Sequence, residues 1–443
     1  MIVSVGRMMR KGGGGLIWPK GLKESIKAIY DPAKQGMTNY DVIEAYAEDF
    51  TGWEYRDYRG TAKITNNAIV ITNVVETNNI VEDAKEPYSD LTIRVTGVTE
   101  DKYLIVRQGR GKPEAHIKKD GIYTFKDNNL YFGFGVSVIG ECNITITQLP
   151  TSILKDLSGN GNHAYLYGGK GKLNSGMGVY KFDFLSDLLI NSAYLPYTER
   201  QYDSICSLAG HPNGWLFQYK SLTDIPAFKV EVKGIVNDRF VYRYYDENGN
   251  RGKEIIINKD GIYELPISYS VENNTGVGIV CNNICQDNVC FTQIPDYPNQ
   301  LCYDGMMYAV CYDFPILTDY TVMADRTWFE RQNRACFLSK ITTSGTGAFG
   351  FEFYNEDTTY SFGRVNNVEQ FKDGITYQIT NSYNGIVKLD YIVNGKDNAE
   401  LYIGKLRPSE RLAFIGCHGA IIVADRSFTE EEINWLKDNL FRK

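Results

Sequence analysis

Short alternating runs of hydrophobic and polar residues dominate this chain. They are rich in Val, Ile, Tyr, Thr and Phe, and Gly, Asn and Asp interrupt them. A period of two turns one side of a strand toward a core and the other toward solvent, so these runs predict antiparallel β-strands. The clearest predicted strands lie at residues 91–95, 103–107, 228–232 and 240–244. We therefore expect an all-β protein.

The C-terminal segment departs from this alternation and predicts a short helix. Thr429 suits the N-cap, and Glu432 follows three residues later to complete a capping box. Phe428 before the cap and Ile433 after it can form a hydrophobic staple. The residues expected to face a sheet are Ile433, Trp435, Leu436 and Leu440.

The middle of the chain contains an internal repeat. Residues 91–97 match residues 228–234, an offset of 137, and Lys-Asp-Gly-Ile-Tyr occurs at both 119–123 and 259–263, an offset of 140. A last match, between 147–150 and 292–295, has an offset of 145, so insertions separate the blocks. We predict two copies of one small β-sandwich module, at 40–150 and 200–298. The Lys-Asp-Gly-Ile-Tyr motif itself is typical of a tight turn leading into a strand.

Composition and charge narrow the possible partners. A chain of 443 residues is long enough for several compact modules, and 43% hydrophobic with 23% charged residues is a normal globular balance. The net charge of −7 gives no overall attraction to phosphate backbones, so nucleic acid is not an expected partner. No apolar run approaches the roughly 18 residues that a membrane-spanning helix requires, so membrane insertion is not expected.

Nine cysteines form an odd set, which cannot all pair within one chain. Free thiols in a reducing cytoplasm fit this number best. Cys281, Cys285 and Cys290 suggest a metal site, but their spacing lacks a paired CxxC knuckle. We interpret these three as buried strand cysteines.

Three further motifs carry a family resemblance. Residues 156–163 read Asp-Leu-Ser-Gly-Asn-Gly-Asn-His, residues 320–328 read Tyr-Thr-Val-Met-Ala-Asp-Arg-Thr-Trp, and residues 425–433 read Asp-Arg-Ser-Phe-Thr-Glu-Glu-Glu-Ile. Together they resemble concanavalin A-like, laminin-G-like jelly-roll domains. More narrowly, they resemble structural proteins of phages and prophages of gut Bacteroidales, including crAss-like phages. Residues 30–40 of this chain also resemble the opening segment of those proteins.

The resemblance implies a domain organisation. A laminin-G-like jelly roll would be interrupted by the two related modules and closed by the C-terminal helix, and the glycine-rich N-terminus would be an anchoring arm. The corresponding boundaries are 1–26 for the arm, 40–150 and 200–298 for the modules, and 27–39 with 151–199 and 299–443 for the jelly roll. Folds of this kind host lectins, hydrolases and scaffolds, so the resemblance implies no single activity.

Two sets of residues are candidate binding sites. Asp156 and Asn160 occupy early positions of a calcium-like loop, but Tyr167 stands where an EF-hand has its last ligand, so we interpret the loop as a turn, with a laminin-G-type calcium site as the alternative. No other cofactor is expected. Exposed aromatic residues could form a carbohydrate platform, or could pack within strands. These candidates are Trp215, Tyr244, Tyr245 and Trp328.

Catalysis is not expected. Jelly-roll glucanases supply their carboxylates as Glu-x-Asp-x-x-Glu from one strand, and this string is missing here. Glu352, Glu356 and Asp357 come nearest, but they lie where a predicted strand runs into a turn.

These observations together favour a bacteriophage virion protein, a head or tail appendage similar to a fibre. The N-terminus lacks the apolar core of a signal peptide, as expected for assembly in the host cytoplasm. We expect a homo-oligomer, with a trimer as the first hypothesis, whose arm contacts other virion proteins and whose modules bind host-surface glycans. The alternative is a cellular lectin or adhesin without catalytic activity.

Overall fold

The computed structural model describes most of the strands and their connections. It covers 17–37, 42–44, 54–55, 61–64, 68–82, 91–108, 114–125, 134–150, 152–167, 170–173, 188–201, 203–219, 224–271, 276–317, 319–330, 335–341, 347–353, 359–362, 365–370, 374–381, 400–406 and 414–441. The strands are grouped into five sheets, and every named strand pair in the described residues is antiparallel. The prediction of an all-β protein is confirmed. Within these residues no helix has the length and apolar character to cross a bilayer.

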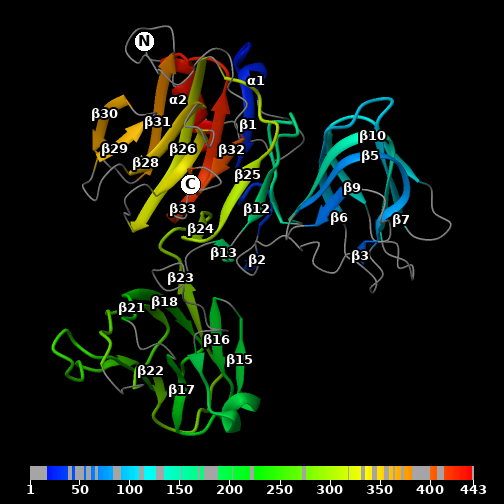
Figure 1. The fold of residues 1–443 in the computed structure, drawn as a ribbon. Coiled ribbons are helices and arrows are strands. Elements are labelled where there is room, and N and C mark those ends of the chain that lie inside the picture. The colour runs from blue at the N-terminus through cyan, green and yellow to red at the C-terminus, as the bar shows by residue number, and fades with distance from the viewer. Residues whose placement is uncertain are drawn as a thin grey trace, which may run out of the picture.

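Two sheets form the body that we call the main sandwich (Figure 1). Sheet A contains β2 (Val42–Glu44), β13 (Lys170–Leu173), β24 (Leu301–Asp304), β33 (Ile415–Ala424), β26 (Asp319–Glu330) and β31 (Gly374–Asn381), with β1 (Ile26–Tyr30) also paired to β33. Sheet C contains β11 (Ile153–Leu154), β12 (Ala164–Tyr167), β25 (Tyr308–Cys311), β32 (Leu401–Ile403), β27 (Cys336–Ile341), β28 (Gly347–Phe353), β29 (Thr359–Phe362) and β30 (Val365–Gln370).

Strand β33 is apolar on both of its faces because sheet A is covered on both sides. All ten residues of β33 are buried. Ile421 and Val423 belong to one hydrophobic core together with sheet C residues such as Leu166 and Ile403. Ile422 alternates with them and belongs to a second core on the opposite face of the sheet. The continuous hydrophobic run thus replaces the usual alternation where a strand has no solvent face.

The second face of sheet A is covered by helix α2 (Glu430–Leu440). Thr429 accepts a hydrogen bond from the backbone of Glu432, and the Glu432 carboxylate accepts one from the Thr429 backbone, so the predicted capping box is confirmed. The predicted inward face is confirmed as well. Its buried members are Ile433, Leu436 and Leu440, and Trp435 packs against the same core.

The end of the predicted N-terminal arm also belongs to this layer. Trp18 lies 4.9 Å from Trp435 between ring centroids, and Leu22 in helix α1 (Leu22–Ser25) is fully buried in the same core. Residues 1–16 of the arm lie outside the described residues. The arm predicted at 1–26 is therefore too long, because its last residues bury apolar side chains against α2.

Module copy 1 forms sheet B. Two long strands, β5 and β10, run through it, and shorter strands pair with each of their halves. Its strands are β3 (Glu54–Tyr55), β4 (Thr61–Ile64), β5 (Ala68–Glu82), β6 (Leu91–Thr96), β7 (Tyr103–Gln108), β8 (Ala115–Ile117), β9 (Gly121–Phe125) and β10 (Phe134–Leu149).

Module copy 2 forms sheets D and E, which enclose one hydrophobic core. Sheet D contains β14 (Leu188–Leu189), β17 (Gly214–Tyr219), β22 (Gly278–Cys281), β19 (Phe240–Arg243) and β20 (Ile255–Ile257). Sheet E contains β15 (Thr198–Arg200), β16 (Ser204–Ser207), β23 (Val289–Ile294), β18 (Phe228–Lys233) and β21 (Gly261–Leu265). Strands β14 and β15 both begin before residue 200, where the sequence placed the start of this module.

The repeated segments form the same strand pairs in both copies. Strand β6 pairs with β9 and with the end of β10, and β18 pairs with β21 and β23 in the same way. Strand β7 pairs with β8 and the start of β10, as β19 pairs with β20 and β22. Strand β5 of copy 1 thus corresponds to two strands of copy 2, β16 and β17. Strand β10 likewise corresponds to β22 and β23.

The Lys-Asp-Gly-Ile-Tyr motif is a structural turn in both copies. The carboxylate of Asp120 accepts a hydrogen bond from the backbone N–H of Val98, and Asp260 accepts one from Ile235 in the same way. The hydroxyls of Tyr123 and Tyr263 donate to the carbonyls of Lys119 and Lys259, at the start of each motif. The motif therefore fastens one hairpin of the module rather than forming a site.

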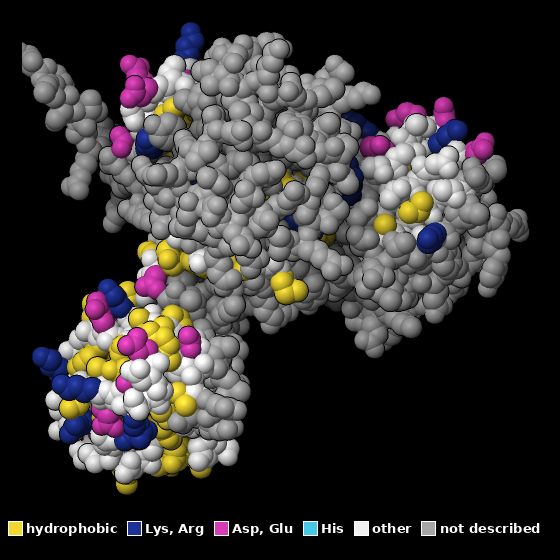
Figure 2. All heavy atoms as spheres, turned by 60° about the vertical axis from the view of Figure 1, so that its left-hand side comes forward, with side chains coloured by type: hydrophobic (Ala, Val, Ile, Leu, Met, Phe, Trp, Pro, Cys, Tyr) yellow, Lys and Arg dark blue, Asp and Glu magenta, His cyan; other side chains and the backbone are white. Residues whose placement is uncertain are grey.

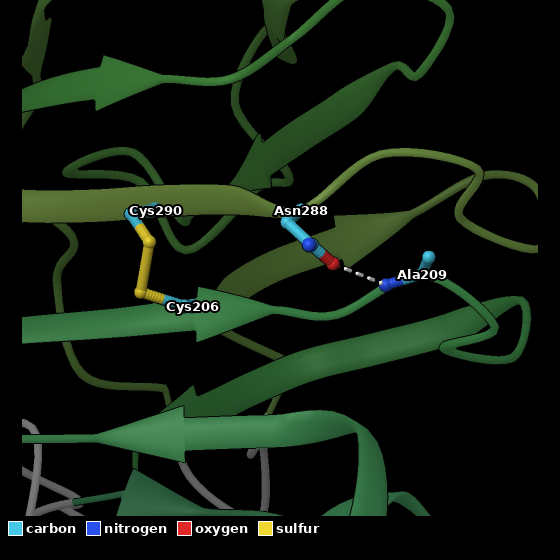
Figure 3. The surroundings of a disulfide bond; sticks show 4 residues. All are labelled: Cys206, Ala209, Asn288 and Cys290. Atoms are coloured by element: carbon cyan, nitrogen blue, oxygen red, sulfur yellow. Dashed lines mark hydrogen bonds between the residues drawn. A yellow bond between two sulfur atoms is a disulfide. The ribbon is translucent and has the colours of Figure 1, made fainter.

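A disulfide joins Cys206 on β16 to Cys290 on β23 (Figure 3). The two residues are direct cross-strand partners, with 4.0 Å between their Cα atoms. The expectation that all cysteines are free thiols was therefore wrong, because pairing depends on which strands become neighbours and this could not be read from spacing. Of the three cysteines interpreted as buried strand residues, Cys281 lies on β22, Cys285 lies in the following turn and Cys290 is disulfide-bonded.

Candidate functional site

The loop at 156–163 is held together by its own side chains. The Asp156 carboxylate accepts hydrogen bonds from the backbone of Ile29, Ser158 and Asn162 and from the Ser158 hydroxyl, at 2.8 to 3.1 Å. Asp156 is buried, so these four donors replace the water that a carboxylate would otherwise bind. The loop thereby joins the start of sheet C to β1 in sheet A.

The other polar residues of this loop serve the same connection. The side-chain amide of Asn160 donates to the carbonyl of Ile26 at 2.7 Å, and that of Asn162 donates to Lys27 at 2.7 Å. His163 accepts from the backbone N–H of Asp156 through Nδ1. Because N–H and O–H donors already surround the Asp156 oxygens and Asn160 presents its amide nitrogen, these residues do not fit a calcium ion. No three metal-ligating side chains are grouped to hold a metal anywhere in the described parts of the chain.

The four aromatic candidates do not form one platform. Tyr245 is buried in the core of copy 2, and Tyr244 packs against that core with its ring stacked on Tyr242 at 5.8 Å. A Cβ on Gly252 would lie 2.4 Å from the Tyr244 ring, so the hairpin covers it. Tyr245 was therefore wrong as a sugar-binding candidate, and half-buried Tyr244 packs inward against the same core. The side chain of Trp328 lies outside the described residues, as do Glu356 and Asp357.

Trp215 remains, on the outer surface of sheet D. It is paired with Val280, which pairs with Val241, which in turn pairs with Ile256, so the four side chains share one face across four strands. Val241 and Val280 alternate along their strands with residues of the module core. We call this row of four residues, with the neighbouring Arg243 and Glu254, the Trp215 face.

Charged groups are held beside the indole ring. The Arg243 guanidinium carbon lies 5.7 Å from the centre of the Trp215 ring, and its Nε donates to the Glu254 carboxylate at 2.9 Å. Both contacts keep the long Arg243 side chain in one orientation, which lowers the entropy cost of using it to bind a ligand. The Trp215 face therefore offers an aromatic ring, a fixed guanidinium with free donors and a carboxylate acceptor within one small area.

A second apolar surface, which contains none of the predicted site residues, lies at one end of copy 2. Leu195 and Tyr197 in the short helix η2 (Ser192–Tyr197) and Ile284 in the 282–288 turn are exposed. Gly210 connects them, since a Cβ there would touch the Tyr197 ring and its N–H donates to the carbonyl of Cys285. We call these three exposed residues the copy-2 tip. Figure 2 shows hydrophobic side chains gathered on the visible face of copy 2, at the lower left.

A signal for the tip was present in the offset of the repeat. Between the matched residues Val138 and Cys281 the offset is 143, and by the last block it has reached 145. The two extra residues fall in the 282–288 turn, so copy 2 carries a longer loop at this end than copy 1. Loops of this kind are where binding residues concentrate. No family model and no curated protein sequence matches this chain.

Proposed function

We propose that this chain is a non-catalytic structural and binding component of a bacteriophage particle, a head or tail appendage. Copy 2 is the part that binds host-surface glycans. The observation that carries the proposal is the Trp215 face, because it combines an outward-facing indole ring with a fixed pair of charged groups. The assignment to a virion rests on the resemblance of the 156–163, 320–328 and 425–433 motifs.

The proposed scaffold is a concanavalin A-like, laminin-G-like jelly roll interrupted by the two modules. Its support comes from strand pairs that join segments on either side of each module. Strand β1 pairs with β33, nearly 400 residues later, and β12 pairs with β25 across copy 2. The loop at 156–163 also connects to β1 across the whole of copy 1.

A sugar ring fits the chemistry of the Trp215 face. The apolar C–H side of a sugar packs on an aromatic ring, while its hydroxyls require both donors and acceptors. Arg243 supplies donors and Glu254 supplies acceptors. Val241 and Val280 are buried beneath this face, so they support the ring and the charged pair rather than contact the sugar. A neutral or acidic glycan is the substrate class that these groups favour.

A glycan array with the purified full chain tests this activity. We expect binding by the wild-type chain and at least a tenfold loss for Trp215→Ala, because the ring is the largest contact that the face offers. Ile122→Ala in copy 1 is the control, and binding should not change. Uniform silence of the wild-type chain on the array would contradict the glycan part of the proposal.

The assembly part of the proposal has its own tests. We propose a homo-oligomer, with a trimer first, in which the N-terminal arm contacts other virion proteins. Light scattering of the purified chain should give a mass of three subunits of 50.2 kDa. Electron microscopy of particles carrying a tagged copy should show the label on head or tail, and particles without label would contradict a virion role.

One observation favours a second candidate function, a cellular lectin or adhesin. The Cys206–Cys290 disulfide is typical of proteins that act in an oxidising environment outside the cytoplasm. A virion protein also reaches such an environment after lysis, so the disulfide alone does not decide. The neighbouring genes distinguish the two functions. Portal, capsid and tail genes would support the virion protein, and outer-membrane transport genes would support the cellular lectin.

A further inference from the structure

The turn that follows β22 in copy 2 contains two close thiols. Cys281 ends the strand and Cys285 lies within the turn, and their Sγ atoms are 2.8 Å apart. Both side chains are buried. A disulfide bond is about 2.05 Å long, so a shift of about 0.8 Å would bring the two sulfurs to bonding distance.

The surroundings hold both sulfurs in place. The hydroxyl of Ser207 donates to Cys285 at 3.1 Å, and the Cys281 thiol donates to the carbonyl of Asn283 at 2.9 Å. The backbone of Cys285 is fixed as well, because its N–H donates to His211 and its carbonyl accepts from Gly210. The turn thus presents the pair in a single arrangement rather than as two independent cysteines.

We propose that Cys281 and Cys285 form a second disulfide in copy 2. The reaction is a thiol–disulfide exchange with a small-molecule disulfide such as glutathione disulfide. One thiolate attacks this disulfide and releases one glutathione thiol, and the other cysteine then displaces the second glutathione from the mixed disulfide. The two cysteines lose two electrons and two protons, and one glutathione disulfide becomes two glutathione thiols. Because both sulfurs are buried in the folded module, the exchange requires either folding in an oxidising environment or local opening of the 282–288 turn after the protein has reached one.

The second disulfide fixes the copy-2 tip. Ile284, which is 64% exposed, lies between the two cysteines, so the bond closes the loop that presents this side chain. Gly210 links the same turn to Tyr197. Closing the loop restricts the conformations of the turn before it contacts a partner. The entropy cost of ordering the turn on binding is therefore lower. Copy 1 has no counterpart, since Val138 stands in the position of Cys281 and the loop is shorter.

Mass spectrometry of the full-length chain tests the proposal and does not depend on glycan binding. The chain is refolded in a glutathione redox buffer, denatured, alkylated with iodoacetamide without reductant, and digested. We expect the peptide with Cys281 and Cys285 to be unalkylated and lighter than the dithiol by two hydrogen atoms. Cys311 and Cys336 are buried free thiols and should be alkylated in the same sample, which controls for general oxidation.

Two results would overturn the proposal. One is alkylation of both Cys281 and Cys285 in protein whose Cys206–Cys290 peptides remain joined. The other is protection from alkylation that a metal chelator abolishes, which would indicate a bound metal in place of a bond. In the Cys285→Ala variant we expect Cys281 to be fully alkylated while the Cys206–Cys290 bond is retained, and loss of that bond would likewise contradict an independent second disulfide.

Discussion

The two module copies share the same pattern of strand pairing but differ in strand continuity, disulfide content and loop length. Both keep the turn aspartate, the tyrosine that closes the turn and the cross-strand pair of arginine and glutamate, Arg107 with Glu114 in copy 1 and Arg243 with Glu254 in copy 2. Copy 1 has long continuous strands, whereas copy 2 has interrupted strands, a disulfide and a longer loop. The turn and the arginine–glutamate pair belong to the framework that both copies share. Function should therefore be sought in what copy 2 adds to that framework, including the Trp215 ring beside Arg243.

The same sheet face is used differently in the two copies. On copy 1, Arg94 bonds Asp313 of the main sandwich at 2.7 Å and lies over the Tyr312 ring. On copy 2 the equivalent position is Glu231, and its cross-strand neighbour Ile262 is 65% exposed. Copy 1 therefore attaches to the scaffold through a face that copy 2 leaves open. This difference supports copy 1 as a structural unit and copy 2 as the outward unit.

The largest expected effect comes from removing the disulfide that only copy 2 has. Cys206 and Cys290 are 84 residues apart, and closing a loop of this length stabilises by about 4.5 kcal/mol in the chain-entropy model. Cys206→Ser with Cys290→Ser should lower the free energy of unfolding of copy 2 by about that amount, measured by hydrogen exchange of the β16 and β23 peptides. The equivalent pair in copy 1 is Val70 and Thr145, and cysteines placed there should form a bond and stabilise copy 1. Equal exchange with and without the bond would contradict this prediction.

The next effect should be the same in both copies. Gly97 and Gly234 have φ of +91° and +99°, and a Cβ on either would lie 2.1 to 2.2 Å from the carbonyl oxygen of Asn143 or Asn288. Replacing either glycine with alanine should cost about 3 kcal/mol, from the left-handed backbone and the displaced carbonyl together. Gly159 has a similar φ but open space around it, so Gly159→Ala should cost only about 1 kcal/mol. Thermal unfolding measures the loss of stability in all three variants. If only one of Gly97→Ala and Gly234→Ala had a mild effect, the two copies would not be structurally equivalent at this turn.

Acid should destabilise the main sandwich more than it destabilises either module copy. Burial lowers the pKa of His418 to about 4, so between pH 6.5 and 4 the unfolded chain takes up a proton that the folded chain does not. Stability contributed by this residue is complete above pH 6.5 and falls by about 3 kcal/mol as the pH reaches 4. Hydrogen exchange should increase in β24, β26 and β33 over this range. In His418→Asn this part of the pH dependence should be missing, and an unchanged profile would refute the assignment.

The smallest expected effect concerns the attachment of copy 1. Arg94 and Asp313 form a partly exposed pair, so a double-mutant cycle with Arg94→Ala and Asp313→Ala should give a coupling energy of about 0.5–1 kcal/mol. Lys229 and Glu264 on the equivalent face of copy 2 pair within the module and give the matched cycle. Only the variants of the Arg94–Asp313 cycle should change the rate of proteolytic cleavage between copy 1 and the main sandwich. A null coupling would show that other contacts hold copy 1.

Local patterns in the sequence predicted local structure well. The alternating runs at 91–95 and 228–232 became β6 and β18, and Thr429 with Glu432 formed the predicted cap. These features depend on neighbours within a few residues, which periodicity and capping preferences describe directly. The repeat also predicted matching turns, because Lys-Asp-Gly-Ile-Tyr is self-contained.

Features that depend on distant residues were not predictable in the same way. The Cys206–Cys290 bond required the pairing of β16 with β23, and the inward position of Tyr244 required the hairpin that covers it. The orientation of Trp215 depends on a register irregularity between Trp215 and Phe217, which breaks simple alternation. The hydrogen bond from Ile29 in β1 to Asp156 spans 127 residues, so no local pattern could tell a turn from a calcium loop.

The central claim is that copy 2 binds glycans while copy 1 is structural, and the two equivalent arginines test it most directly. Arg243→Ala and Arg107→Ala each remove one guanidinium from the same position of the repeat, next to Glu254 or Glu114. Titrated against the glycan that the wild-type chain binds most tightly on the array, Arg243→Ala should weaken binding by at least tenfold and Arg107→Ala should leave it unchanged. Equal losses in the two variants, or a loss with Arg107→Ala alone, would contradict the division of roles between the copies.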